Sequence, residues 1–269
     1  MTESVFIADG EQFIPTENAR GPWDPRALHG GAPAGLMTAA FERMEPGSEL
    51  VIARLGFELL RPTPMAPLTL ATRMVRTGRR VQELAGELWA GEDLVCRAGA
   101  VRVQAVPTDL PPISSPSGET STADIGTRLP PPESGKPVRF ALDGSDETSF
   151  AATAMEMRWL DEPRALGPGR VWMRLGMPLL PGEALSSLAR LAATADFGNG
   201  VSASLPFDRF LFINADLTIH LHRPPLGEWI GLDARTLLYP GGTGIAESVL
   251  HDTSGPVGRA FQTLVVQPR

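Results

Sequence analysis

Apolar positions recur at helical spacing in two segments of the chain. In the first segment, a proline suited to a first helical turn precedes Leu36, Met37, Ala40, Phe41 and Met44. This spacing predicts a helix over about residues 32–44. In the second segment the same spacing joins Leu185, Leu188, Leu191, Ala192 and Ala195, ahead of a glycine-rich stop. Both segments are rich in alanine and mostly apolar all round, so we expect a sheet to cover each helix on more than one side.

Segments with the alternating pattern of strands follow each predicted helix. They are 50–60, 68–77, 80–90 and 94–106 in the first half, and 209–222, 228–238, 244–251 and 257–266 in the second. The two sets superimpose without a gap at one constant shift, which aligns Arg61-Pro62 with Arg223-Pro224 and Arg97-Ala98 with Arg259-Ala260. The pattern predicts an α+β chain made by an internal repeat, each copy a long antiparallel sheet wrapped around a central helix. That arrangement describes two tandem hotdog domains, a double hotdog.

A stretch rich in proline and small polar residues separates the two copies. Residues 107–137 show no hydrophobic period, which is typical of a linker. We therefore predict an N-terminal hotdog domain over 1–106, a linker over 107–137 and a C-terminal hotdog domain over 138–269.

Charge and composition narrow the range of partners. The formal net charge of −7 argues against a nucleic-acid partner, which would need a basic face. No apolar run reaches the length of a membrane span, and the first residues lack the features of a signal peptide, so we expect a cytoplasmic protein that does not enter a membrane. The single cysteine, Cys96, lies in an apolar strand-like stretch and is expected to be a core residue.

One predicted strand contains residues that are candidates for a functional site. Its alternation places four polar residues on one face, namely Asp216, Thr218, His220 and His222. Plain solvent exposure would explain such a face. The equivalent positions of the first half are Arg54, Gly56, Glu58 and Leu60, so the carboxylate and both histidines are present in one copy only. This asymmetry favours one working site per pair of domains.

Other kinds of site find less support. A metal could use Asp216, His220 and His222, but no further cluster of cysteine or histidine lies nearby, so we expect no metal. The chain has no G-x-S-x-G nucleophile motif and no G-x-G-x-x-G dinucleotide motif, so we also expect no cofactor.

A glycine-rich turn leads into the first predicted helix. N–H groups at a helix start lack internal partners and carry the positive end of the helix dipole, so they suit a polarised carbonyl oxygen. Gly30 and Gly31 would let a substrate approach that backbone closely. The turn could also simply cap the helix, with His29 hydrogen-bonded to the main chain.

These features together resemble the thioesterase-like superfamily, and most closely the bacterial acyl-CoA thioesterase II type. The resemblance is carried by His29-Gly30-Gly31, by the stretch from Asp216 to Trp229 and by the strand Arg259-Ala260-Phe261-Gln262, and it covers nearly all of the chain outside the linker. It implies a double hotdog that uses no metal or redox cofactor and hydrolyses an acyl-CoA substrate to free acid and CoA in fatty acid metabolism. By analogy we also expect a homodimer.

The family that this resemblance points to holds and activates the attacking water with an aspartate, a threonine or serine, and a glutamine. The resemblance places the aspartate at Asp216 and the glutamine at Gln262. The hydroxyl position falls on Leu237, so Thr236 could serve only if a bulge shifts the strand register.

In a double hotdog the helix of one half faces the strands of the other, so the glycine turn and Asp216 could form one site. His29, Gly30 and Gly31 would then bind the substrate. Asp196 and Asn199, at the end of the second helix, could line the same site or act as ordinary helix caps. Two alternatives stay open: an acyl-CoA-binding protein without catalysis, and a hotdog enoyl-CoA hydratase or dehydratase, whose D-x-N-P-x-H loop is not found here.

Overall fold

The computed structural model describes residues 3–45, 49–109, 128–140, 148–163 and 165–269, and every structural statement below concerns these parts of the chain. The first half contains β1 (Phe6–Asp9), β2 (Gln12–Pro15), α1 (Gly31–Arg43), β3 (Leu50–Leu59), β4 (Leu68–Arg76), β5 (Val81–Ala90) and β6 (Asp93–Gln104). The second half contains β7 (Lys136–Pro137), β8 (Met155–Trp159), β9 (Gly169–Leu175), α2 (Ser187–Ala195), α3 (Gly198–Val201), β10 (Phe210–Asn214), β11 (Asp216–Leu221), β12 (Ile230–Tyr239), β13 (Thr243–Asp252) and β14 (Gly255–Pro268).

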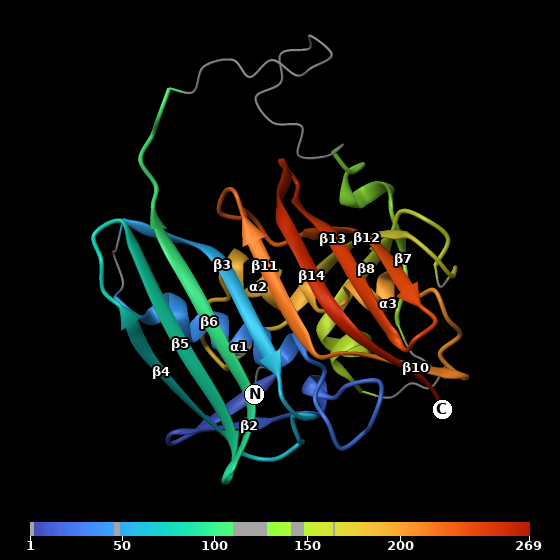
Figure 1. The fold of residues 1–269 in the computed structure, drawn as a ribbon, viewed down its shortest axis with the longest axis horizontal. Helices are drawn as coiled ribbons and strands as arrows, with labels where there is room; N and C mark the ends of the chain where they lie inside the picture. Colours follow the sequence, from blue (N-terminus) through green and yellow to red (C-terminus); the bar gives the residue numbers. More distant parts are fainter. Residues whose placement is uncertain (1–2, 46–48, 110–127, 141–147, 164) are drawn as a thin grey trace.

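The strands form one 14-stranded sheet that runs through both halves of the chain. Its order is β1-β2-β4-β5-β6-β3-β11-β14-β13-β12-β9-β8-β7. The remaining strand, β10, pairs with the same edge of β14 as β11 does, further along that strand. The two halves therefore join where β3 meets β11, and every strand pairing in the described residues is antiparallel. Figure 1 shows the broad sheet with the helices behind it.

The strand register confirms the internal repeat. Gly56 on β3 lies directly opposite Thr218 on β11, and the constant shift found in the sequence makes these two positions equivalent. Within the halves, Gly56 pairs with Gly99 and Thr218 pairs with Phe261, which is the same pairing displaced by that shift. A pairing of equivalent strands about equivalent residues is the arrangement of a two-fold symmetric dimer, here built within one chain. The double hotdog expected from the sequence is thus observed.

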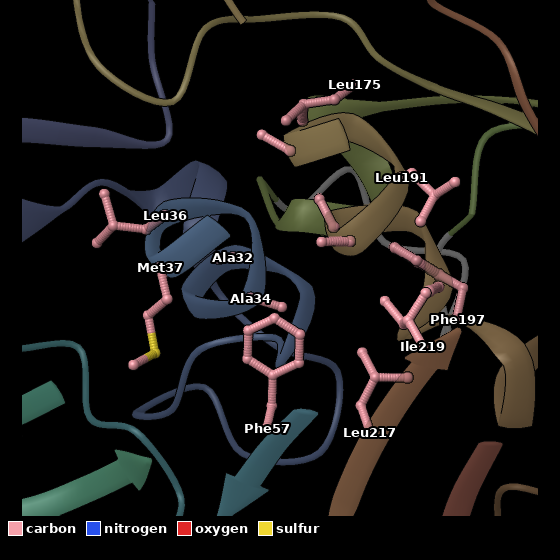
Figure 2. Packing of buried hydrophobic residues seen from close by; sticks show 14 of the residues in the cluster. Ala32, Ala34, Leu36, Met37, Phe57, Leu175, Leu191, Phe197, Leu217 and Ile219 are labelled. Atoms are coloured by element: carbon pink, nitrogen blue, oxygen red, sulfur yellow. The ribbon is translucent and has the colours of Figure 1, made fainter. Parts of the chain in front are cut away.

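The two long helices pack against each other on the inner face of the sheet. Phe57 from β3 and Leu217 and Ile219 from β11 point towards them from the junction of the halves (Figure 2). The helices approach closely because small residues meet at their contact: a Cβ added at Gly35 would lie 3.3 Å from the Cβ of Ala193. This close approach brings the end of α2 next to the beginning of α1.

The predicted helices match α1 and α2 closely, but three features of the sheet differ from the sequence analysis. The segment 209–222 forms two strands, β10 and β11, with a break at Ala215. Residues 128–137, which the sequence analysis places in the linker, pack on the second half: Leu129 is buried and β7 pairs with β8. Residues 110–127 of that stretch lie outside the described residues. Five further strands, β1, β2, β7, β8 and β9, extend the sheet beyond the predicted set.

Two other expectations can be compared with the described parts of the chain. None of the helices there has the length and apolar character needed to cross a membrane. Cys96 is buried, as predicted, and burial raises the pKa of its thiol to about 12. The thiol is therefore uncharged at neutral pH, and Cys96 acts as an apolar core residue.

Candidate functional site

A buried carboxylate lies where the end of α2 meets the beginning of α1. Asp196 follows the last residue of α2 and is only 5% exposed. Its Oδ2 lies 3.0 Å from Nδ1 of His29, which is itself 8% exposed and directly precedes the glycine turn. A Cβ added at Gly30 would lie 2.8 Å from the same Oδ2, so the carboxylate fits there because residue 30 has no side chain. The N-terminus of α1 carries the positive end of the helix dipole, which favours a negative charge at this place.

Two amide side chains reach the same aspartate from the sheet. Asn214, the last residue of β10, donates from Nδ2 to Oδ1 of Asp196 at 2.7 Å. Gln262 on β14 donates from Nε2 to the main-chain oxygen of Asp196 at 3.0 Å, and its Nε2 lies 3.5 Å from Oδ1. Asp196 is thus in contact with one imidazole and two amides, contributed by three separate segments of the chain.

The short helix α3 fixes the orientation of Gln262. The Oε1 atom of Gln262 accepts a hydrogen bond from the main-chain N–H of Asn199 at 2.9 Å, while Asn199 donates from Nδ2 to the oxygen of Phe212 at 3.2 Å. Because Oε1 is bound to a donor, the Nε2 end of the amide must face Asp196. Asn199 therefore supports the site through Gln262, and its side chain does not contact Asp196 in any hydrogen bond described here.

A β-bulge at Ala215 decides which residues of this region face the site. Between Asn214 and Thr218 the chain advances four residues, whereas the paired strand β14 advances only three, from Leu264 to Phe261. An extra residue in one strand moves the following side chains to the opposite face. Asn214 therefore points inward to Asp196, while Asp216 points outward.

The predicted pairing of Asp216 with Gln262 is consequently wrong in its geometry. Asp216 lies on the outer face of the sheet, where its Oδ1 accepts a hydrogen bond from the N–H of Thr263 at 2.6 Å. Gln262 is 2% exposed and lies on the inner face. One water molecule cannot contact both side chains, because the backbone of the sheet separates them. The structure instead brings Gln262 together with Asp196.

The expected hydroxyl does not join Asp216 either. Thr236 on β12 points inward, and its Oγ1 lies 2.7 Å from Oγ of Ser202, which follows α3. Where the resemblance implies a hydroxyl beside the aspartate, the group found beside Asp196 is the amide of Asn214. As for the metal alternative, no group of three or more His, Cys, Asp or Glu suited to a metal ion occurs in the parts of the chain that the structure describes.

The glycine turn is bound to His29. The N–H of Gly31 points at Nδ1 of His29, with the two nitrogens 3.0 Å apart, so this position is occupied within the protein, although we expected it to be available to a substrate. The imidazole is stacked on Phe197, with ring centroids 4.2 Å apart, and Phe150 lies on it at 5.2 Å. His29, Gly30 and Gly31 are therefore all brought to Asp196, as parts of one packed cluster.

Sequence reasoning missed Asn214 and gave Asp196 only a lining role. The bulge left no signal in the sequence, because Phe210, Leu211, Phe212 and Ile213 are all apolar and the alternation that would reveal a change of face is absent. Asp196 follows an alanine-rich helix, and at such a position the sequence is equally consistent with a helix cap and with a site residue. The contact between His29 and Asp196 joins residues far apart in the chain, which no local pattern records.

A matched pair of glycines in α3 tests the role of this helix in holding Gln262. A Cβ added at Gly198 would lie 2.8 Å from Oε1 of Gln262, whereas a Cβ at Gly200 would meet nothing within 4 Å. We expect Gly198→Ala to displace the amide of Gln262 and to destabilise the protein by about 1–3 kcal/mol, because the added methyl group overpacks a buried contact. Gly200→Ala should not destabilise the protein. Equal free energies of unfolding in the two variants, measured by urea denaturation, would contradict this role of α3.

Comparison with known proteins shows which family models match this chain. A model of the acyl-CoA thioesterase N-terminal domain matches residues 19–105, and a model of the C-terminal domain of the same family matches residues 127–266. A comparison with curated proteins finds no match.

Several solved structures share the fold. A proposed thioesterase II from Thermobifida fusca YX is 17% identical, with a TM-score of 0.72, and the match covers 99% of this chain and 96% of that one. An acyl-CoA thioesterase II from Mycobacterium marinum is 14% identical, with a TM-score of 0.65 and coverage of 100% and 95%. A hotdog protein of unknown function from Alicyclobacillus acidocaldarius is 18% identical, with a TM-score of 0.70 and coverage of 98% and 95%. At these identities the likeness shows the fold.

Proposed function

Because the chain belongs to the acyl-CoA thioesterase family, we propose that it hydrolyses an acyl-CoA thioester to the free acid and CoA, with Asp196 as the general base. The observation that supports this most is the buried carboxylate of Asp196, contacted by the amides of Asn214 and Gln262 beside the N-terminus of a helix. A thioesterase needs a group that takes a proton from water, groups that hold the water, and positive potential for the oxyanion. These residues could supply all three.

The proposed reaction uses water as the nucleophile. Asp196 accepts one proton as the water oxygen bonds to the thioester carbon, a contribution of roughly 10²- to 10⁴-fold for a general base. The electron pair of the carbonyl bond moves onto oxygen, and the positive end of the α1 dipole stabilises that charge. When the carbonyl re-forms, the carbon–sulfur bond breaks, and the proton held by Asp196 passes to the departing thiolate. No metal or other cofactor takes part in this proposal.

An asparagine can replace the hydroxyl that the resemblance implies. The Nδ2 of Asn214 is used to hold Oδ1 of Asp196, which leaves its Oδ1 to accept a hydrogen bond from the attacking water. Gln262 can act through Nε2, which lies near the same carboxylate oxygen. We therefore replace Asp216 with Asp196, and Thr236 with Asn214, in the proposed catalytic set, and retain Gln262.

The release of free thiol from a panel of acyl-CoA esters of different chain length tests the proposal. The wild-type protein should release thiol steadily, and Gln262→Ala should lower kcat about 100-fold, because the water loses a donor and Asp196 loses a neighbour that positions it. The KM should change little, since the lost contacts act on the water rather than on the acyl-CoA. Unchanged turnover in Gln262→Ala would remove this residue from the mechanism.

A second candidate is an acyl-CoA-binding protein without catalysis. Two observations favour it: an amide lies where the resemblance implies a hydroxyl, and the N–H of Gly31 points at Nδ1 of His29 instead of into open space. The same panel separates the two functions. Tight binding of an acyl-CoA without thiol release, measured by calorimetry, would support the binding protein and contradict hydrolysis.

A further inference from the structure

His29 has two neighbours that compete for one ring atom. Its Nδ1 lies 3.0 Å from the N–H group of Gly31 and 3.0 Å from Oδ2 of Asp196. A neutral imidazole nitrogen has a single in-plane position, which holds either a lone pair or a proton. Nδ1 therefore cannot accept from Gly31 and donate to Asp196 at the same time.

The location of one proton decides between two arrangements. Without a proton, Nδ1 accepts from the N–H of Gly31, and its lone pair faces the carboxylate oxygen, which is repulsive when Asp196 is ionised. With a proton, Nδ1 donates to Oδ2 of Asp196, and the N–H of Gly31 loses its acceptor. A hydrogen bond to a charged carboxylate is roughly twice as strong as a neutral one, so the second arrangement is favoured while Asp196 is ionised.

The packing around the ring keeps Nδ1 in this place. Phe197 and Phe150 lie on the imidazole, and the main-chain N–H of His29 donates to the oxygen of Ala19 at 2.9 Å. His29 is 8% exposed, so bulk water does not substitute freely for either neighbour. Cys96 also contributes to the environment of Asp196, but its thiol is uncharged, with a pKa of about 12.

We propose that His29 is a positioning residue that donates its Nδ1 proton to Oδ2 of Asp196 and so holds this carboxylate in the orientation that the proposed base requires. This inference rests on the proposed hydrolysis and adds a group to it.

The kinetic test substitutes the ring and keeps its stacking. His29→Phe retains an aromatic side chain against Phe197 and Phe150 but cannot donate to Asp196. We expect its kcat to fall about 100-fold with little change in KM, because the lost interactions act in the transition state. The control is His220→Phe, the same substitution at an exposed histidine of β11, which should leave kcat unchanged.

NMR spectroscopy shows directly which ring nitrogen of His29 carries the proton. In protein with isotopically labelled histidine nitrogens, the NMR signal of His29 can be assigned by its absence in His29→Phe. We expect the tautomer with the proton on Nδ1 in the wild type. In Asp196→Ala, Nδ1 has only the N–H of Gly31 beside it, so the proton should move to Nε2.

The outcomes separate this inference from the proposed function. If the wild type releases no thiol from any acyl-CoA, the proposed function fails, and the tautomer measurement still decides how His29 is bonded. If the wild type is active but His29→Phe retains its kcat, or if the wild-type proton lies on Nε2, the role of His29 is overturned and the hydrolysis stands.

Discussion

Replacing Asp196 with asparagine should lower kcat by about 10³- to 10⁴-fold, because the isosteric amide cannot accept the proton of the attacking water. Asn214 holds one oxygen of this carboxylate and His29 the other, so the shape of the site should be largely retained in the variant. Binding of the acyl-CoA should therefore persist while turnover is lost. Thiol release and calorimetric titration, performed on the same preparation, measure the two quantities separately.

The matched control is Asp216→Asn, which makes the same chemical change on the outer face of the sheet. Asp216 is bonded there to the N–H of Thr263, an interaction that an asparagine oxygen can also make. We expect this variant to retain the wild-type kcat. The reverse result, with Asp216→Asn inactive and Asp196→Asn active, would place the base on the outer face and refute the site described above.

The repeat is the part of the fold that the sequence predicted best. One constant shift relates the two sets of strands, and in the structure the equivalent residues Gly56 and Thr218 pair where β3 meets β11. Burial favours such a prediction, because a strand with one buried face must keep its alternation and cannot slip by one residue. The two alanine-rich helices were predicted for the same reason, since they are covered by the sheet and by each other.

The site was predicted less well because it depends on a change of register and on tertiary contact. Asp196 and Asp216 both follow apolar segments, and local sequence does not say which of them is buried. The extra residue at Ala215 directs Asn214 inward and Asp216 outward, and the four apolar residues before Asn214 conceal the change. The resemblance identified Gln262 as a catalytic residue, whereas Asp196 beside it was expected only to line the site.

The two ends of the helix pair show how a duplicated fold can hold a single candidate site. At one end, Asp196 after α2 meets His29 before α1. At the other end, Glu42 of α1 accepts a hydrogen bond from Ser186, which precedes α2, at 2.5 Å. Burial raises the pKa of Glu42, and no amide equivalent to Gln262 contacts it in the hydrogen bonds described. The helices thus bring an acidic residue to each junction, but within the described residues only the Asp196 junction is surrounded by an imidazole and two amides.

Replacing Gly31 with alanine should destabilise the protein by about 3 kcal/mol, at the upper end of the range for overpacked cores. The added methyl group would overlap the main-chain oxygen of Ala193 in α2 and would lie 3.0 Å from a ring carbon of Phe150. A backbone oxygen within a helix cannot move aside as a side chain can, so the two helices would have to separate. The free energy of unfolding can be measured by urea denaturation monitored by circular dichroism.

The control for this prediction is Gly35→Ala, one turn further along α1. A Cβ at this position would lie 3.3 Å from Cβ of Ala193 and 3.4 Å from Cδ2 of Leu179, so the crowding is slight and a small movement of the Leu179 side chain and of the helices relieves it. Alanine is also favoured over glycine within a helix by roughly 0.5–1 kcal/mol, which offsets the tight contact. We expect the stability of Gly35→Ala to stay within about 1 kcal/mol of the wild type. An equal loss of stability in both variants would contradict this prediction. It would mean that the α1–α2 contact is equally tight at both glycines, and that the absence of a side chain at residue 31 does not explain the close approach of α2 to the glycine turn.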